Sequence, residues 1–85
     1  MTNKITDLTE DALHILIGKN VAMLRKKAKL SQLALSLEIG NKSPSLISSA
    51  EIYTNKRHFN IVQLQKIAKA LNVDICEFFN YSNTH

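Results

Sequence analysis

Apolar residues recur along the chain at helical spacing, in stretches separated by short polar turns. A capping-box spacing at Asp7 and Glu10 precedes the first stretch. This stretch fits one helix over residues 8–28, or a short helix joined to a longer one near Gly18. Because glycine weakens a helix interior, we predict a break or kink at Gly18. The stretch has an apolar residue every three or four positions: Leu13, Ile17, Val21, Leu24 and Ala28.

Two shorter helices follow, joined by a turn that begins with a glycine. Ser31 is suited to cap a helix over residues 32–39, which ends at Gly40 because glycine readily adopts positive φ. The next helix is predicted over residues 44–53, with Pro44 at its first position, where the missing N–H of proline costs nothing. Such a pair has the arrangement of a helix-turn-helix, whose second helix enters the major groove of DNA.

The rest of the chain predicts two further helices. A polar loop, in which Asn55 can adopt positive φ, leads to a capping box formed by Asn60 and Gln63. A second such box, Asp74 and Glu77, begins a short final helix that carries two phenylalanines. The sequence therefore predicts an all-α fold, a compact bundle of about five short helices. The helix after Asn60 has a regular apolar face: Ile61, Leu64, Ile67, Ala68 and Leu71.

Composition excludes several function classes. A chain of 85 residues fits one domain and is too short for barrels or doubly wound sheets. The single cysteine, Cys76, cannot form an intrachain disulfide and is expected to be a small core residue. Without a signal peptide or a membrane-length apolar stretch, a cytoplasmic protein is expected. No phosphate loop, paired carboxylates or metal cluster occurs, so we expect no enzyme activity, metal or cofactor.

Positive charge is concentrated in one segment of the chain. The net charge is +4, but residues 19–29 carry +5 from one arginine and four lysines, whereas residues 1–18 carry −2. A basic cluster beside a nearly neutral remainder is typical of a surface that binds a polyanion. A solvated helix face gives the same pattern, so charge alone leaves both interpretations open.

A set of positions in register resembles the lambda-repressor-like (Xre/Cro) DNA-binding domain. The resemblance implies a helix-turn-helix domain over residues 17–81, between an N-terminal helical extension over 1–16 and a polar tail over 82–85. The turn after Gly40 and the loop after Glu51 are longer than in the usual family pattern. The positions that carry the resemblance are Ile17-Gly18-Lys19, Leu24-Arg25, Ser31-Gln32, Leu35, Gly40, Ile47-Ser48, Glu51, Leu64, Ile67-Ala68, Ala70-Leu71 and Phe79.

The resemblance places the helix over residues 44–53 in the major groove of double-stranded DNA. It also implies that Arg25 pairs with Glu51 and that Gln32 lies next to a phosphate. Serine can hydrogen-bond to either base type, so a serine-rich face predicts weak sequence discrimination per half-site. The candidates for reading bases are Lys42, Ser43, Ser45, Ser48 and Ser49. The candidates for phosphate contacts are Gln32, Asn55, Lys56 and Arg57.

Three functions fit these observations. The first is a sequence-specific transcriptional regulator, expected to be a homodimer on a palindromic site. The second is an antitoxin with a toxin as protein partner, or the controller of a restriction system. The third, from another class, is a helical adaptor for a protein target.

Association is suggested by Leu33 and Leu37, which are i, i+4 neighbours on a helix face that is usually charged in the family that the chain resembles. Because apolar surface in water is unfavourable, we expect the N-terminal segment to cover these leucines, in the same chain or in a partner.

Overall fold

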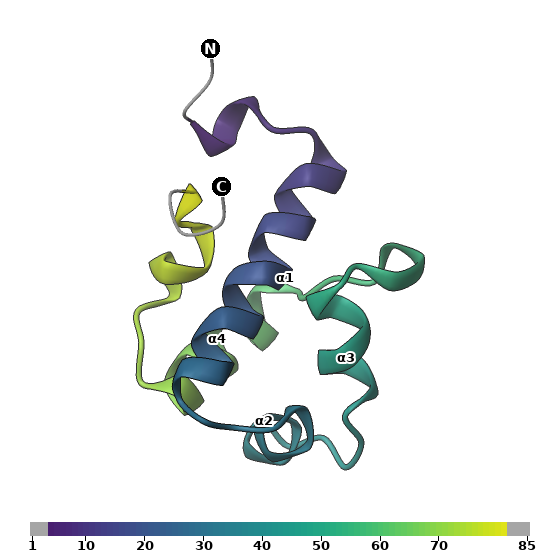
Figure 1. Cartoon of the computed structure of the whole chain (residues 1–85), viewed down its shortest axis with the longest axis vertical. Helices are drawn as coiled ribbons and strands as arrows, with labels where there is room; N and C mark the ends of the chain where they lie inside the picture. Colours follow the sequence, from purple (N-terminus) through teal and green to yellow (C-terminus); the bar gives the residue numbers. More distant parts are fainter. Residues whose placement is uncertain (1–3, 82–85) are drawn as a thin grey trace.

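The computed structural model describes residues 4–81, and all regular elements in this range are helices around one core (Figure 1). The all-α prediction is confirmed. The predicted count of about five helices is slightly off, because the last one is a 3₁₀-helix. The α-helices of the described range are α1 (Glu10–Lys27), α2 (Gln32–Glu38), α3 (Ser45–Glu51) and α4 (Ile61–Leu71). Its 3₁₀-helices are η1 (Ile5–Asp7), η2 (Thr54–Lys56) and η3 (Ile75–Phe79).

The first helix, α1, runs without interruption through Gly18, so the predicted break is wrong. The glycine serves close packing instead of a bend. A Cβ at this position would stand 2.6 Å from the carbonyl oxygen of Ala50 and 2.7 Å from that of Glu51. The backbone of α3 therefore lies directly against α1, which a side chain at position 18 would prevent.

The start of α1 also differs from the prediction. Thr9, and not Asp7, is the N-cap, and its hydroxyl accepts a hydrogen bond from the N–H of Ala12 at 3.1 Å. The boundary that we expected between residues 16 and 17 falls inside this helix, where Leu16 and Ile17 are both buried. The N-terminal extension is therefore continuous with the first helix of the bundle.

Local capping signals set most of the other helix ends. The Ser31 hydroxyl accepts from the N–H of Ala34 at 3.0 Å, as a cap of α2 should. Asn60 and Gln63 form the predicted capping box of α4, with two bonds of 2.8 Å. By contrast, α3 is shorter than the predicted helix over residues 44–53, because positive φ at Tyr53 stops it.

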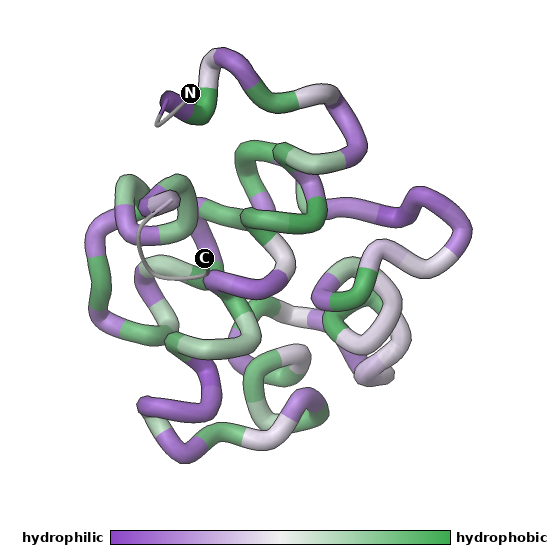
Figure 2. Tube along the Cα trace, turned by 45° about the horizontal axis from the view of Figure 1, so that its top comes forward, coloured by the Kyte–Doolittle hydropathy of each residue, from purple (hydrophilic) through white to green (hydrophobic). Residues whose placement is uncertain are grey.

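The core lies between α1, α4 and the pair α2–α3, and η3 closes it on a further side (Figure 2). Three residues predicted on apolar faces or in the core are instead outside it, and the first is Ala28, the exposed C-cap residue of α1. Ile61 is 64% exposed in the first turn of α4, where Phe59 before it and Leu64 after it are the residues that enter the core. Cys76 is exposed because η3 directs Phe78 inward, and a residue two positions away faces another side of a 3₁₀-helix. The completely buried apolar side chains include Val21, Leu35, Ile47, Ile67 and Phe78.

A buried asparagine attaches the C-terminal segment to α1. The side-chain amide of Asn20 donates to the carbonyl oxygens of Phe78 at 2.9 Å and Asn80 at 3.0 Å. Asn20 has no exposed surface, so these bonds replace water for its amide nitrogen. Residues 75–80 are therefore held to the first helix by direct polar contacts as well as by Phe78.

The two leucines on α2 remain exposed, with 45% of Leu33 and 57% of Leu37 accessible. The N-terminal segment lies at the opposite end of the longest axis from α2 (Figure 1), so the expected cover within the same chain is wrong from residue 4 onward. That a partner chain covers Leu33 and Leu37 stays a prediction. None of the helices within residues 4–81 is both long and apolar enough to cross a membrane.

Candidate nucleic-acid interface

The α2–turn–α3 unit has a rigid connection. Gly40 takes φ of +90°, and its N–H donates to the carbonyl oxygen of Leu37 at 3.1 Å. The next N–H, of Asn41, donates to the Ser36 carbonyl oxygen at 2.8 Å. These bonds satisfy carbonyls at the end of α2, as a glycine-terminated helix requires. The direction in which the chain enters α3 is therefore fixed.

One face of α3 is anchored in the core and the other is open. Ile47 and Ala50 are almost completely buried, and their spacing of three residues places them on one face of the helix. Ser45 is exposed, Ser48 and Ser49 are half-buried, and the turn before the helix exposes Lys42 and Ser43. The structure thus gathers the five base-reading candidates on the turn and on α3, without testing their role.

Local hydrogen bonds organise the serines at the start of α3. The Ser43 and Ser45 hydroxyl oxygens are 2.8 Å apart, and the N–H of Ser45 donates to Ser43 Oγ at 3.2 Å. Pro44, predicted at the first helical position, is the N-cap residue, and it has no side-chain capping bond. The Ser48 hydroxyl donates to the Ser45 carbonyl oxygen at 3.2 Å. A hydroxyl has one donor and two acceptor sites, so these serines keep capacity for an external partner.

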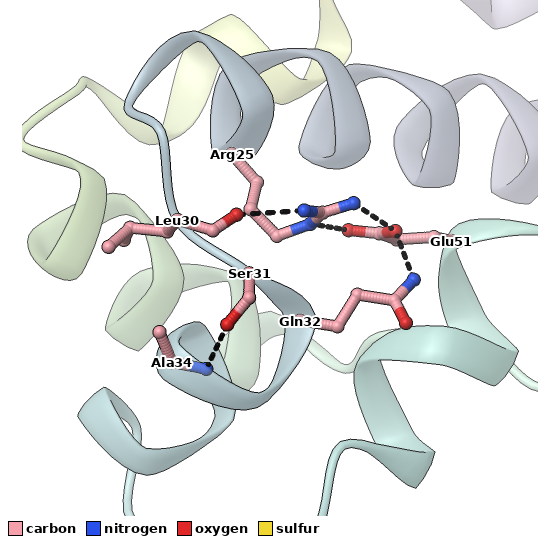
Figure 3. A network of polar contacts seen from close by, with 6 residues as sticks. All are labelled: Arg25, Leu30, Ser31, Gln32, Ala34 and Glu51. Atoms are coloured by element: carbon pink, nitrogen blue, oxygen red, sulfur yellow. Dashed lines mark hydrogen bonds and ion pairs between the residues drawn. The ribbon is translucent and has the colours of Figure 1, made fainter.

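Behind α3, the predicted contact between Arg25 and Glu51 is present (Figure 3). The guanidinium donates from Nε to Glu51 Oε2 at 2.7 Å and from Nη2 to Oε1 at 3.1 Å. Its Nη1 donates to the Leu30 carbonyl oxygen at 2.8 Å. Both charged residues are buried, with 7% and 5% exposed. This two-point ion pair joins α1 to the last residue of α3.

The same network includes Gln32, the first residue of α2. Its Nε2 donates to Glu51 Oε1 at 2.9 Å, so the side chain links α2 to α3 (Figure 3). The phosphate contact predicted for Gln32 must compete with this bond. The buried position of Arg25 also means that it does not belong to the exposed basic surface, which in residues 19–29 is formed by lysines alone: Lys19, Lys26, Lys27 and Lys29.

The loop after α3 has an unusual backbone. The positive φ predicted for Asn55 is confirmed at 52°, but Tyr53 and Lys56 also adopt positive φ, of 59° and 61°. Outside glycine and asparagine, this conformation costs roughly 1–2 kcal/mol per residue. The sequence gives no signal for it at a tyrosine or a lysine. The loop places Asn55, Lys56 and Arg57, three of the phosphate candidates, side by side and exposed.

A cluster of rings lies beneath this loop and was missed by sequence reasoning. The Tyr53 hydroxyl donates to Asp11 Oδ1 at 2.6 Å, and the His14 ring lies 5.7 Å from the Tyr53 ring and 3.9 Å from the His58 ring, between centroids. His58 Nδ1 also donates to the Lys56 carbonyl oxygen at 2.9 Å. No spacing rule could have found the cluster, since its members come from α1 and from both ends of the loop.

Two pKa values reflect these contacts. The hydrogen bond to Asp11 raises the pKa of Tyr53 to about 12. Partial burial, and then the neighbouring His58, lower the pKa of His14 below its ordinary value. Within residues 4–81, no three His, Cys, Asp or Glu side chains gather in a way that could hold a metal ion.

Comparison with known proteins links this arrangement to a family. A family model described as Helix-turn-helix, HTH_3, matches residues 21–78. The solved structures that match include the restriction-modification controller protein C.AhdI from Aeromonas hydrophila, at 28% identity and a TM-score of 0.71, covering 80% of this chain and 98% of that chain. They also include an HTH_3 family transcriptional regulator from Vibrio cholerae, at 26% identity and a TM-score of 0.73, covering 89% of this chain and 40% of that chain. No curated protein shows a significant match.

Proposed function

Because the chain belongs to the HTH_3 helix-turn-helix family, we propose that it is a regulator that binds double-stranded DNA with α3 in the major groove. The observation that carries the proposal is the anchoring of α3. Its inner face is buried at Ile47 and Ala50, and its last residue is held by Arg25, while its serine face stays open. A helix fixed on one side and polar on the other is suited to dock rigidly in a groove.

The exposed residues divide into two roles in this proposal. Phosphate contacts come from the basic loop, which we define as Asn55–Arg57, and supply most of the affinity. Base contacts come from the turn and α3, through Lys42 and the serines, and supply a modest sequence preference. Gln32 adds a phosphate contact if it exchanges its bond to Glu51 for one to DNA.

We further propose that two copies bind a palindromic site, with half-sites about one helical turn apart. A two-fold symmetric dimer matches the symmetry of such a site. The exposed Leu33 and Leu37 on α2 give the chain apolar surface that a second copy could cover.

Control of a restriction-modification system is a second candidate for the biological role. It is favoured by the similarity to C.AhdI, which extends over 98% of that controller protein. A transcriptional regulator and a restriction-modification controller would bind DNA by the same chemistry. The genes next to the binding site distinguish the two roles. A role as the antitoxin of a toxin stays a prediction from the sequence, and no contact in the described residues adds to it.

The test begins with selection of a preferred duplex from a random pool, followed by affinity measurements against salt. For a dimer with about three phosphate contacts per half-site, the log–log slope should be roughly −5. Lys56→Ala and Arg57→Ala should weaken binding to all sequences alike and flatten the slope by about one unit. Lys42→Ala and Ser45→Ala should instead change the preference among sequences.

Lys69→Ala, an exposed substitution on α4, is the matched control and should leave affinity and slope unchanged. A wild-type protein that binds no duplex even at low salt contradicts the proposal and favours the protein adaptor. A change of sequence preference in the Lys56 and Arg57 variants, with none in Ser45→Ala, keeps DNA binding but reverses the assigned roles.

A further inference from the structure

We infer that Asp11 and His14, on the N-terminal half of α1, are positioning residues that hold the basic loop in place for phosphate contact. Both lie before residue 21, where the match to the family model begins. The inference rests on the proposed DNA binding and assigns a part in it to a segment that the family match does not include.

The loop after α3 has firm anchors only outside its exposed part. At one end Glu51 is buried in its ion pair with Arg25, and at the other end the Phe59 side chain is 5% exposed in the core. Residues 54–58 are exposed along their whole length. The connection between the anchors therefore depends on contacts made by its own side chains.

Those contacts are made with α1. Asp11 accepts the Tyr53 hydroxyl at the start of the loop, and His14 stacks on His58 at its end, with 3.9 Å between ring centroids. His14 and Tyr53 are also stacked, at 5.7 Å. Two α1 residues one helical turn apart thus hold both ends of the exposed segment.

The backbone of the loop explains why such contacts are needed. Positive φ at Tyr53, Asn55 and Lys56 is unfavourable for two of the three residue types, and such conformations persist only where surrounding contacts enforce them. Strained backbone of this kind concentrates at functional sites. Here it shapes η2 (Thr54–Lys56), the turn that follows α3 in the chain and is followed directly by Arg57. The α1 contacts therefore fix the place of the cations relative to the helix proposed to enter the groove.

The test compares Asp11→Ala and His14→Ala with Glu10→Ala. Glu10→Ala is the matched control because it removes the same charge as Asp11→Ala from the same turn of α1, and the exposed Glu10 acts on His14 and Tyr53 through its charge alone. On the selected duplex, the first two variants should weaken binding several-fold and flatten the log–log salt slope by about one unit, as loss of a phosphate contact does. Glu10→Ala should keep the wild-type slope.

Two further measurements separate positioning from general damage to the fold. First, His14→Phe keeps a ring for stacking and should recover most of the affinity that His14→Ala loses. Second, His14→Ala should cost little affinity when Lys56 and Arg57 are already alanine, because a loop without cations has nothing left to position. In hydrogen exchange, the N–H groups of Lys56 and Arg57, bonded to Tyr53 and Thr54, should exchange faster in both alanine variants.

The outcomes distinguish this inference from the proposed function. If the wild-type protein binds the duplex and Asp11→Ala and His14→Ala keep its affinity and slope, the positioning role is wrong while DNA binding stands. If the wild-type protein binds no duplex, both fail together. Melting curves establish that each variant is folded, and Tyr53→Phe, which removes only the hydroxyl, replaces Asp11→Ala if that variant unfolds. The inference is also overturned if His14→Ala weakens DNA binding as much in the protein that already carries Lys56→Ala and Arg57→Ala as it does in the wild type.

Discussion

A Cβ on Gly18 would stand 2.6 Å from the carbonyl oxygen of Ala50, so α1 and α3 meet at a residue that has no side chain. Gly18→Ala should therefore destabilise the protein, although alanine favours a helix interior by about 1 kcal/mol over glycine. Overpacking of this kind costs typically 1–3 kcal/mol, and here the obstacle is backbone that cannot rotate away. Thermal unfolding should show a lower Tm, by about 4–8 °C per kcal/mol. A raised Tm would mean that the helices separate easily.

The ion pair behind α3 gives a second prediction. Arg25→Ala and Glu51→Ala each leave a buried charge without its partner, which costs about 3–5 kcal/mol. Gln32→Ala removes a single hydrogen bond to the same carboxylate and should cost about 1 kcal/mol. Urea unfolding measures all three, with exposed Lys69→Ala as the reference. A free energy of unfolding for Arg25→Ala close to that of Lys69→Ala would show that the ion pair adds no stability.

The buried amide of Asn20 gives a third prediction. Asn20→Asp has the same shape but loses the donor to the carbonyl oxygens of Phe78 and Asn80 and introduces a buried charge. It should cost at least the roughly 1–3 kcal/mol of an unsatisfied buried group. Because the lost bonds attach the segment after α4, amides of η3 should lose exchange protection first. Equal stability of Asn20→Asp and wild type at neutral pH would contradict this account.

The sequence was sufficient wherever a structural feature depends on neighbouring residues. The capping box of Asn60 and Gln63, the cap at Ser31 and positive φ at Asn55 all follow from short-range chemistry. The inward positions of Ile47 and Ala50 follow from helical period alone. Local rules thus predicted most elements of the fold.

Features that depend on distant segments were mispredicted or missed. Gly18 has the signature of a helix break, and only the position of α3 against it gives the residue its actual role. The stacking of His58 on His14 has no local signal either, because His14 lies on α1, far from the loop in sequence. Positive φ at Tyr53 has no local cause and is maintained by contacts across the fold. The candidate site therefore needed the structure more than the fold did.

The stacked pair of histidines predicts how stability depends on pH. Partial burial first, and then the neighbouring His58, lower the pKa of His14 below 6.5, although Glu10 and Asp11 act in the opposite direction. The unfolded chain therefore takes up a proton on His14 at a higher pH than the folded protein does. The contribution of His14 to stability is complete above pH 6.5 and is lost as the pH falls through the lowered folded-state pKa.

His14→Phe tests this prediction, because it keeps a ring against His58 but cannot be protonated. Urea unfolding of both proteins between about pH 8 and 5 gives the difference in free energy of unfolding as a function of pH. Above pH 6.5 this difference should be constant, and below it the variant should gain steadily on the wild type, since only the wild type must protonate residue 14, while His58 is present in both proteins. Acidic groups common to both proteins cancel in the comparison. A difference that stays flat across the whole range would show that His14 titrates as an ordinary solvated histidine and that the stack imposes no cost on its charge.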